Sequence, residues 1–170
     1  MEKIRVEKGE LTVLVAERRV GMTTFLCEMA VSAIASGESV LVISSSYKQA
    51  LDNKKAIADK SGSPDMINMA VAEFEVLEKM DLSGYDLIIF DTPNLFRYDG
   101  RVMGVLLKQA DNGAKIVVGI TWENICFDDK YRKVIVEQFT NRTASSYYIT
   151  TNRYNQDWRV YSIPYIPIKK

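Results

Sequence analysis

Residues 11–44 read LTVLVAERRVGMTTFLCEMAVSAIASGESVLVIS, and this stretch decides the fold class. Leu11–Ala16 is an apolar run rich in β-branched residues, which predicts a buried strand ending in the polar turn Glu17–Gly21. Apolar residues then recur at helical spacing, so we expect a helix over Thr23–Ala35. Ser39–Ser44 predicts a second strand, buried on both faces because its apolar residues do not alternate with polar ones. Buried strands joined by a helix are typical of a parallel α/β sheet.

The rest of the chain continues this alternation of strands and helices. At 170 residues it has the length of one domain, and we see no internal repeat or linker. The sequence therefore predicts one domain, residues 1–170, with a mainly parallel sheet flanked by helices and a C-terminal antiparallel strand pair. The further expected elements are strands at 67–71, 85–90 and 115–121, helices at 47–60, 72–80, 101–110 and 131–139, a loop at 61–64, and closing strands at 145–152 and 158–163 around a turn at 154–157.

Composition excludes several classes of chemistry. The chain contains no histidine, which rules out Ser-His-Asp and Cys-His catalysis and histidine-ligated zinc. Its two cysteines, Cys27 and Cys126, are far apart in apolar surroundings and are expected to be reduced thiols. The N-terminus is charged and lacks the apolar core of a signal peptide, and no apolar run is long enough to span a bilayer. We therefore expect a cytoplasmic protein without a membrane partner.

Charge is balanced overall but unevenly distributed. Basic and acidic residues both number 22, whereas residues 130–170 hold eight basic and two acidic side chains. Aromatic residues are interleaved with the basic ones there, a pattern used to bind single-stranded nucleic acid but also found on solvated faces. The residues expected to contact a protein partner or nucleic acid are Arg142, Arg153 and Arg159.

The turn after the first predicted strand has the context of a phosphate-binding loop. Such a loop needs a glycine-rich turn, a lysine for the phosphates and a Ser/Thr hydroxyl for Mg²⁺ at the start of a helix. Residues 16–24 read AERRVGMTT, so Gly21 and Thr23 are correctly placed but Met22 occupies the lysine position. Taken alone, this pattern fails the motif, and an ordinary strand-turn-helix corner stays open as a reading.

The order of motifs along the chain resembles the C-terminal motor domain of DnaB-type replicative helicases, a RecA-like fold. That family has an Ala-Arg-Pro-Ser-Met-Gly-Lys-Thr-Thr-Phe-type loop where this chain has residues 16–25. YDLIIFDTPNLF at 85–96 resembles its Walker B strand, with Asp91 as the acidic residue. KIVVGITWEN at 115–124 resembles the strand leading to its sensor glutamine, and residues 146–163 resemble its closing strands with the Lys-x-Arg element.

The departures from the family fall on the groups that carry the chemistry. Met22 replaces the lysine, Ser46 aligns with the catalytic glutamate, Trp122 with the sensor glutamine and Thr151 with the lysine of Lys-x-Arg. The family's charged groups stabilise phosphoryl transfer, so their loss makes efficient hydrolysis improbable. What the resemblance implies is possible binding of ATP or ADP with Mg²⁺. The implied nucleotide-binding residues are Arg18, Arg19, Gly21, Met22, Thr23 and Thr24, and the implied metal ligands are Thr23 and Asp91.

These observations favour a catalytically degenerate RecA-like domain that acts in DNA replication or recombination. It would bind a partner ATPase such as a helicase subunit, a second copy of itself, or DNA, with Arg153 at the interface. One alternative is a small ATPase in which Arg18 or Arg19 replaces the lysine. Another is a nucleic-acid-binding module that ignores nucleotide. FDTP at 90–93 also resembles the switch segment of ParA/MinD-type ATPases, whose Lys-Gly-Gly signature this chain lacks.

Overall fold

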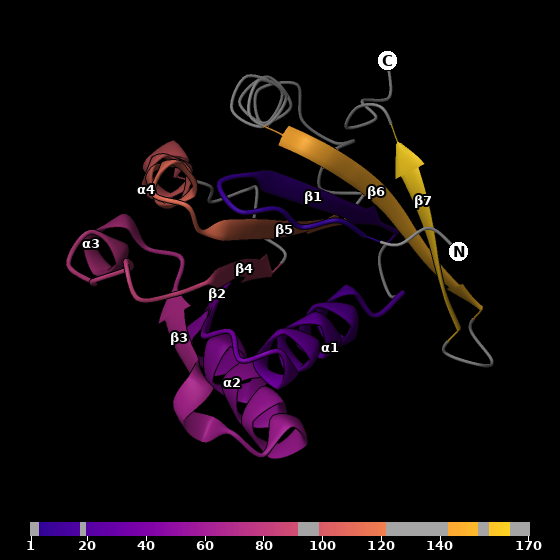
Figure 1. Cartoon of the computed structure of the whole chain (residues 1–170), viewed down its shortest axis with the longest axis horizontal. Helices are drawn as coiled ribbons and strands as arrows, with labels where there is room; N and C mark the ends of the chain where they lie inside the picture. The colour runs from indigo at the N-terminus through magenta and orange to yellow at the C-terminus, as the bar shows by residue number, and fades with distance from the viewer. Residues whose placement is uncertain (1–3, 18–19, 92–98, 122–142, 153–156, 164–170) are drawn as a thin grey trace.

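The computed structural model describes residues 4–17, 20–91, 99–121, 143–152 and 157–163. Strands and helices alternate in these ranges up to β5, and two consecutive strands follow (Figure 1). In chain order the elements are β1 (Leu11–Ala16), α1 (Met22–Ala35), β2 (Val40–Ser44), α2 (Tyr47–Ser61), a 3₁₀ turn (Pro64–Met66), β3 (Ile67–Val71), α3 (Phe74–Leu77), β4 (Leu87–Asp91), α4 (Gly100–Asp111), β5 (Lys115–Thr121), β6 (Thr143–Asn152) and β7 (Asp157–Ile163).

The strands form one seven-stranded sheet in the order β3-β2-β4-β5-β1-β6-β7. Every neighbouring pair is parallel except β6 and β7, which are antiparallel. The predicted mainly parallel sheet with a closing antiparallel pair is thus confirmed. Residues 11–16, 67–71 and 115–121 are strands with the bounds the sequence predicts.

The apolar strands divide their side chains between two cores, because neighbouring residues of a strand point to opposite faces. Val13 and Val15 join the core under α3 and α4, whereas Leu14 and Ala16 join the core under α1 and α2. Figure 1 shows these two helix pairs on opposite faces of the sheet. Both faces of the central strands are therefore covered, as their unbroken apolar runs predict.

Two elements differ most from their predicted bounds, while α1, β2, α2, α4, β6 and β7 differ by one or two residues at an end. The helix expected at 72–80 is only the single turn Phe74–Leu77, since the following amides form short i→i+3 bonds, from Lys79 to Val76 and from Met80 to Leu77. The strand expected at 85–90 begins at Leu87 and includes Asp91. Its first two expected residues, Tyr85 and Asp86, precede the strand, and the Asp86 carboxylate accepts a 2.9 Å bond from the Ser39 amide. The predicted helix at 131–139 and the turn at 154–156 lie outside the described residues.

The segment before β1 is held against the sheet on the α1 side. The Arg5 amide donates a 3.0 Å bond to the Tyr147 hydroxyl, and the Thr12 and Ser145 hydroxyls each donate to the Arg5 carbonyl at 3.3 Å. Ile4 and Val6 pack against the α1-side core. Among the helices that the structure describes, none has the length and apolar character required to cross a membrane.

Candidate functional site

The carboxyl ends of the parallel strands bring two of the predicted site residues, Thr23 and Asp91, together. In an open α/β sheet, ligand crevices form at this edge. Ser44 ends β2 and pairs with Asp91 at the end of β4, which pairs in turn with Gly119 of β5. The turn that follows Ala16 lies at the same edge because β1 runs parallel to β5.

Gly21 sets the start of α1. It has φ 83° and ψ 38°, a left-handed conformation that glycine adopts without strain. No side chain caps the helix at this residue. The amides of the first turn have no intrahelical acceptors, which is the arrangement that phosphate-binding helices use.

Thr23 and Asp91 are in direct contact, as the predicted loop position requires. The Thr23 hydroxyl lies 3.2 Å from Asp91 Oδ1 and 3.1 Å from Oδ2. Asp91 is only 1% exposed. The predicted proximity of the 16–24 turn to Asp91 is therefore confirmed, although the contact itself assigns no role to either residue.

Sequence reasoning missed the two other members of this polar cluster. Asn53, which is 6% exposed, donates to Asp91 Oδ2 at 2.9 Å and to the Ser44 hydroxyl at 3.2 Å. A signal was available, because Asn53 lies between Ala50 and Ile57 on the stripe of α2 that faces the core. A polar residue on a buried stripe must find partners, and here they are the ends of β2 and β4.

Met22 points into the core. Its side chain is 4% exposed and packs in the α1-side core with Leu26. A Cβ placed on Gly119 would lie 3.0 Å from the Met22 sulfur and 2.8 Å from Leu26 Cδ1, so the absence of a side chain at Gly119 makes room for both. A glycine within a strand signals a close approach of this kind.

Trp158 lies over the start of α1. Its ring makes an edge-to-face contact with Phe25, at 5.3 Å between centroids and 75° between planes. A Cβ on Gly21 would lie 2.8 Å from Trp158 Cη2, so the indole contacts the glycine backbone directly. The position of Trp158 beside Gly21 was not predicted from the sequence.

The remaining predicted residues that the structure describes do not join this cluster. Thr24 is exposed on α1, and Arg159 is exposed on β7 opposite Thr150 of β6. Ser46 caps α2, since its hydroxyl accepts a 3.2 Å bond from the Gln49 amide. Thr151 pairs with Trp158 in the β6–β7 ladder. The predicted residues that lie outside the described ranges are Arg18, Arg19, Trp122, Arg142 and Arg153.

Cys27 is a buried residue of α1 whose thiol is affected by the charge of Asp91. Burial, followed by the negative charge of Asp91, raises the pKa of its thiol from 9.0 to about 11. A thiol with this pKa is almost entirely protonated near neutral pH and is a poor nucleophile. Cys27 is therefore a packing residue of α1.

The described residues fit only part of a site for ATP and Mg²⁺. A hydroxyl and a carboxylate are suitable ligands for Mg²⁺, and Thr23 and Asp91 supply them. The position that should supply a cation to the phosphates holds the buried thioether of Met22, which has neither charge nor a hydrogen-bond donor. Among the described residues, no group of three or more His, Cys, Asp or Glu side chains could hold a metal ion.

Comparison with known proteins supports the fold. No protein-family model matches the chain, and no curated protein matches it. Among solved structures, the flagellar accessory protein FlaH from Methanocaldococcus jannaschii matches with a TM-score of 0.61 at 12% identity, over 92% of this chain and 78% of that one. The chain thus has a RecA-like P-loop fold, and identity this low shows the fold alone.

Proposed function

We propose that this chain is a catalytically degenerate relative of DnaB-type helicase motor domains, and that it works by binding a RecA-like ATPase subunit during DNA replication or recombination. The observation that carries the proposal is the burial of Met22 against Gly119. The residue in the lysine position serves the hydrophobic core, so its side chain does not compensate phosphate charge. Losing a charge-assisted hydrogen bond to phosphate weakens that contact by about 1.5–3 kcal/mol.

The contacts of Asp91 support the same proposal. Its carboxylate accepts bonds from Thr23 on both oxygens and from Asn53 on one. If a cation bound to Thr23 and Asp91, the hydrogen bonds between these two side chains would have to break, because both would coordinate the cation instead. In this proposal, the hydrogen bonds among Thr23, Asp91 and Asn53 connect α1, β4 and α2, and their role is structural.

The role of Ser46 also favours a non-catalytic domain. Water activation needs a carboxylate at this position of the family, and Ser46 instead caps α2 through its hydroxyl. Trp158 adds a steric argument, because its indole lies against the Gly21 backbone that a phosphate would have to approach. The cap formed by Ser46 and the packing of Trp158 on Gly21 thus stabilise the fold at positions where the family activates water and binds phosphate.

The chain retains a residue that matches the subunit-interface arginine of the family, which supports a binding role. In the family it resembles, RecA-like domains pack side by side and place a basic finger beside a neighbour's nucleotide. Arg153 is the matching residue, and Arg142 and Arg159 share the basic C-terminal part of the chain. We propose Arg153 as the contact to the partner ATPase.

Calorimetry with ATP, with and without Mg²⁺, tests the proposed loss of nucleotide chemistry. We expect no binding or weak binding by the wild type. Met22→Lys is expected to restore binding at most, because Ser46 and Trp122 still lack the carboxylate and the amide. Tight Mg²⁺-dependent binding that needs Arg18 or Arg19 would favour the small-ATPase alternative instead.

Co-purification with the host's replicative helicase tests the proposed partner. Arg153→Ala should weaken the complex, whereas Lys55→Glu, an exposed change on α2, should leave it intact. A complex unaffected by Arg153→Ala would remove the proposed contact. Salt-sensitive binding of single-stranded DNA by the isolated chain, with no helicase complex, would favour the nucleic-acid-binding alternative.

A further inference from the structure

A cavity of about 520 Å³ lies on the α1 side of the sheet. One of its walls is a stripe along α1, formed by Phe25, Met29, Ser32 and Ala33 of the helix and by Ser36, its C-cap. These residues recur at helical spacing, so they share one face of α1. The stripe is about 16 Å long, at roughly 1.5 Å of rise per residue. The cavity is therefore elongated along the helix.

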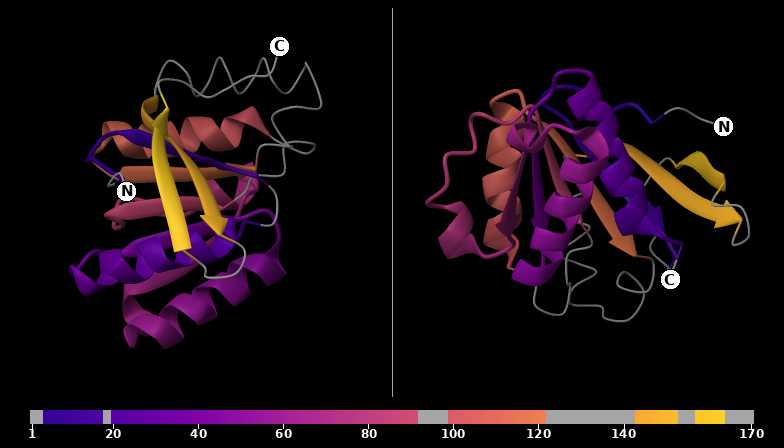
Figure 2. Two further views of the ribbon diagram at one scale, coloured as in Figure 1. Left: turned by 90° about the vertical axis from the view of Figure 1, so that its right-hand side faces the viewer. Right: turned by 90° about the horizontal axis from the view of Figure 1, so that it is seen from below.

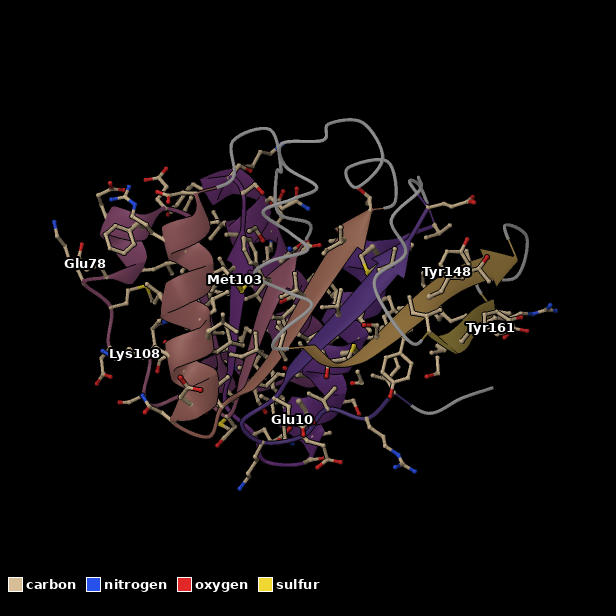
Figure 3. All side chains as sticks on the ribbon, turned by 90° about the horizontal axis from the view of Figure 1, so that it is seen from above. Glu10, Glu78, Met103, Lys108, Tyr148 and Tyr161 are labelled. Carbon is tan, nitrogen blue, oxygen red and sulfur yellow. The ribbon has the colours of Figure 1, made fainter. Side chains whose placement is uncertain are left out.

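The opposite wall comes from β7 and from the segment before β1. Trp158 and Val160 are alternate residues of β7 and point to the same side, and Ile4 and Val6 line the cavity from the N-terminal segment. Figure 2 (right) shows α1 and this segment next to the β6–β7 pair. Tyr161, the next residue of β7, lies on the other face of the sheet (Figure 3). The residues that line the cavity in this argument all belong to the described ranges.

Trp158 and Phe25 form an aromatic end whose shape is fixed by contacts within the chain. Their rings meet edge to face, with 5.3 Å between centroids. The indole also lies against the Gly21 backbone, since a Cβ there would be 2.8 Å from Trp158 Cη2. Ala33 and Val160, both buried, continue the apolar lining. A preformed, mostly apolar surface with a few polar groups is typical of small-molecule sites.

The other end is polar, and its charges are paired. The Lys115 ammonium donates to the Glu38 carboxylate, and the two side chains are 22% and 23% exposed. Because these opposite charges compensate each other, neither an anionic nor a cationic head group gains a net attraction there. A neutral hydroxyl can accept from the ammonium and donate to the carboxylate. Asp157, the third charged residue of the described lining, is exposed at the aromatic end, where solvent screens its charge.

We propose that this cavity binds a neutral, elongated apolar molecule with one hydrogen-bonding head group, of the class of long-chain alcohols. The apolar body lies along α1 with its end against Trp158 and Phe25, and the head group lies beside Lys115 and Glu38. This inference goes beyond the proposed function and does not rest on it, because it requires neither the loss of nucleotide chemistry nor a partner ATPase.

Fluorescence titration of the purified full chain with phenylnaphthylamine, a neutral aromatic probe that brightens in apolar surroundings, tests the site. We expect saturable binding of one probe per chain and its displacement by decanol. Octanol should bind about tenfold more weakly than decanol, because it buries two fewer methylene groups. Decanoate and decylammonium should each bind at least about tenfold more weakly than decanol, because a charged head group loses water without gaining a net charge partner.

A filling substitution tests the location of the probe. Ser32 lines the cavity from the middle of the α1 stripe, so Ser32→Phe should weaken probe binding roughly tenfold or more by occupying that space. Ala56→Phe is the matched control, because it introduces the same side chain at an exposed position of α2 and should bind the probe as the wild type does. Urea denaturation shows whether both variants keep the fold.

Two reciprocal substitutions test the position of the head group. Glu38→Gln leaves the Lys115 charge without its compensating carboxylate, so the affinity for decanoate should rise about tenfold. Lys115→Gln leaves the Glu38 charge instead, so the affinity for decylammonium should rise by a similar factor. The affinity for decanol should change little in both variants. Each variant is the control for the other, because both break the same ion pair.

Three results would overturn the proposal. They are a wild type that shows no saturable binding of the probe, unchanged probe binding by Ser32→Phe, and head-group preferences that Glu38→Gln and Lys115→Gln do not alter. A wild type that prefers decanoate or decylammonium to decanol by about tenfold would assign the cavity to a charged ligand and overturn the proposal as well.

Discussion

The carboxyl edge of the parallel strands and the β6–β7 pair differ in the exposure of their polar and aromatic residues. At the carboxyl edge, Asp91 and Asn53 are buried and bonded to each other. On the β6–β7 pair, Arg159 and Tyr161 are exposed. RecA-like folds place their reacting groups at the carboxyl edge of the sheet. In this chain, the polar side chains described at that edge form hydrogen bonds with one another. Under the proposed function, the polar groups at the carboxyl edge serve the fold, and the surface of the chain carries the binding role.

The largest expected effect concerns Asp91. Asp91→Ala leaves the Asn53 amide and the Thr23 hydroxyl without their buried acceptor, so we expect the free energy of unfolding to fall by about 3 kcal/mol. Urea denaturation measures it. Asp59→Ala, an exposed change on α2, is the control and should stay within about 0.5 kcal/mol of wild type. If Mg²⁺ stabilises the wild type and Asp91→Ala abolishes that gain, the cluster is a metal site and the comparison fails.

The burial of Met22 predicts a somewhat smaller effect at Gly119. Gly119→Ala places a methyl group against Met22 and Leu26, which should destabilise the fold by about 2 kcal/mol. Gly104→Ala is the matched control, because a Cβ there meets nothing within 4 Å and alanine favours the helix. Combined with Met22→Ala, the loss should be smaller than the sum of the two single losses, because the truncated side chain no longer meets the added methyl group. Additive effects of the two substitutions would show that the side chains do not meet.

Ser46 tests whether a residue at a catalytic position of the family serves the fold. Ser46→Ala removes the cap of α2 and should lower the free energy of unfolding by about 1 kcal/mol. Ser46→Asp keeps a capping oxygen and should retain most of the stability. Equal stability of the alanine variant and the wild type would mean that the cap contributes nothing.

The smallest expected effect is a pH dependence from Cys27. Burial and Asp91 raise its pKa to about 11 in the folded chain, so between pH 9 and 11 the unfolded chain ionises first and stability falls as the pH rises. At pH 9.5 the loss from this group is about 0.8 kcal/mol relative to neutral pH. Cys27→Ala should remove that part of the slope, and Asp91→Asn should reduce it. An unchanged slope in Cys27→Ala would show that the thiol is not shielded.

The fold was largely predictable because its strands are unbroken apolar runs. Leu11–Ala16 and Lys115–Thr121 are buried along most of their length, and short β-branched runs bounded by turns are typical of strands buried on both faces. The errors fall where backbone hydrogen bonding decides the boundary. The Asp86 carboxylate that binds the Ser39 amide is a contact between distant residues, which a local pattern does not contain.

The candidate site was only partly predictable. The position of Thr23 beside Asp91 follows from strand order and the start of a helix, which the sequence indicates. The inward rotation of Met22 and the bonds of Asn53 depend on contacts across the sheet, with Gly119 and Asp91. The sequence did contain two signals, a glycine within a strand (Gly119) and an asparagine on the apolar stripe of a helix (Asn53). Both indicate that the residue has a close contact, but neither identifies the residue that it contacts.

The most direct test of the account is ATP turnover by the purified full chain with Mg²⁺, measured beside Thr23→Ala. If the crevice is filled by the chain's own side chains, phosphate release stays at background for both proteins. Steady turnover by the wild type that Thr23→Ala abolishes would contradict the account, because it would show that Thr23 and Asp91 hold a working metal–nucleotide site.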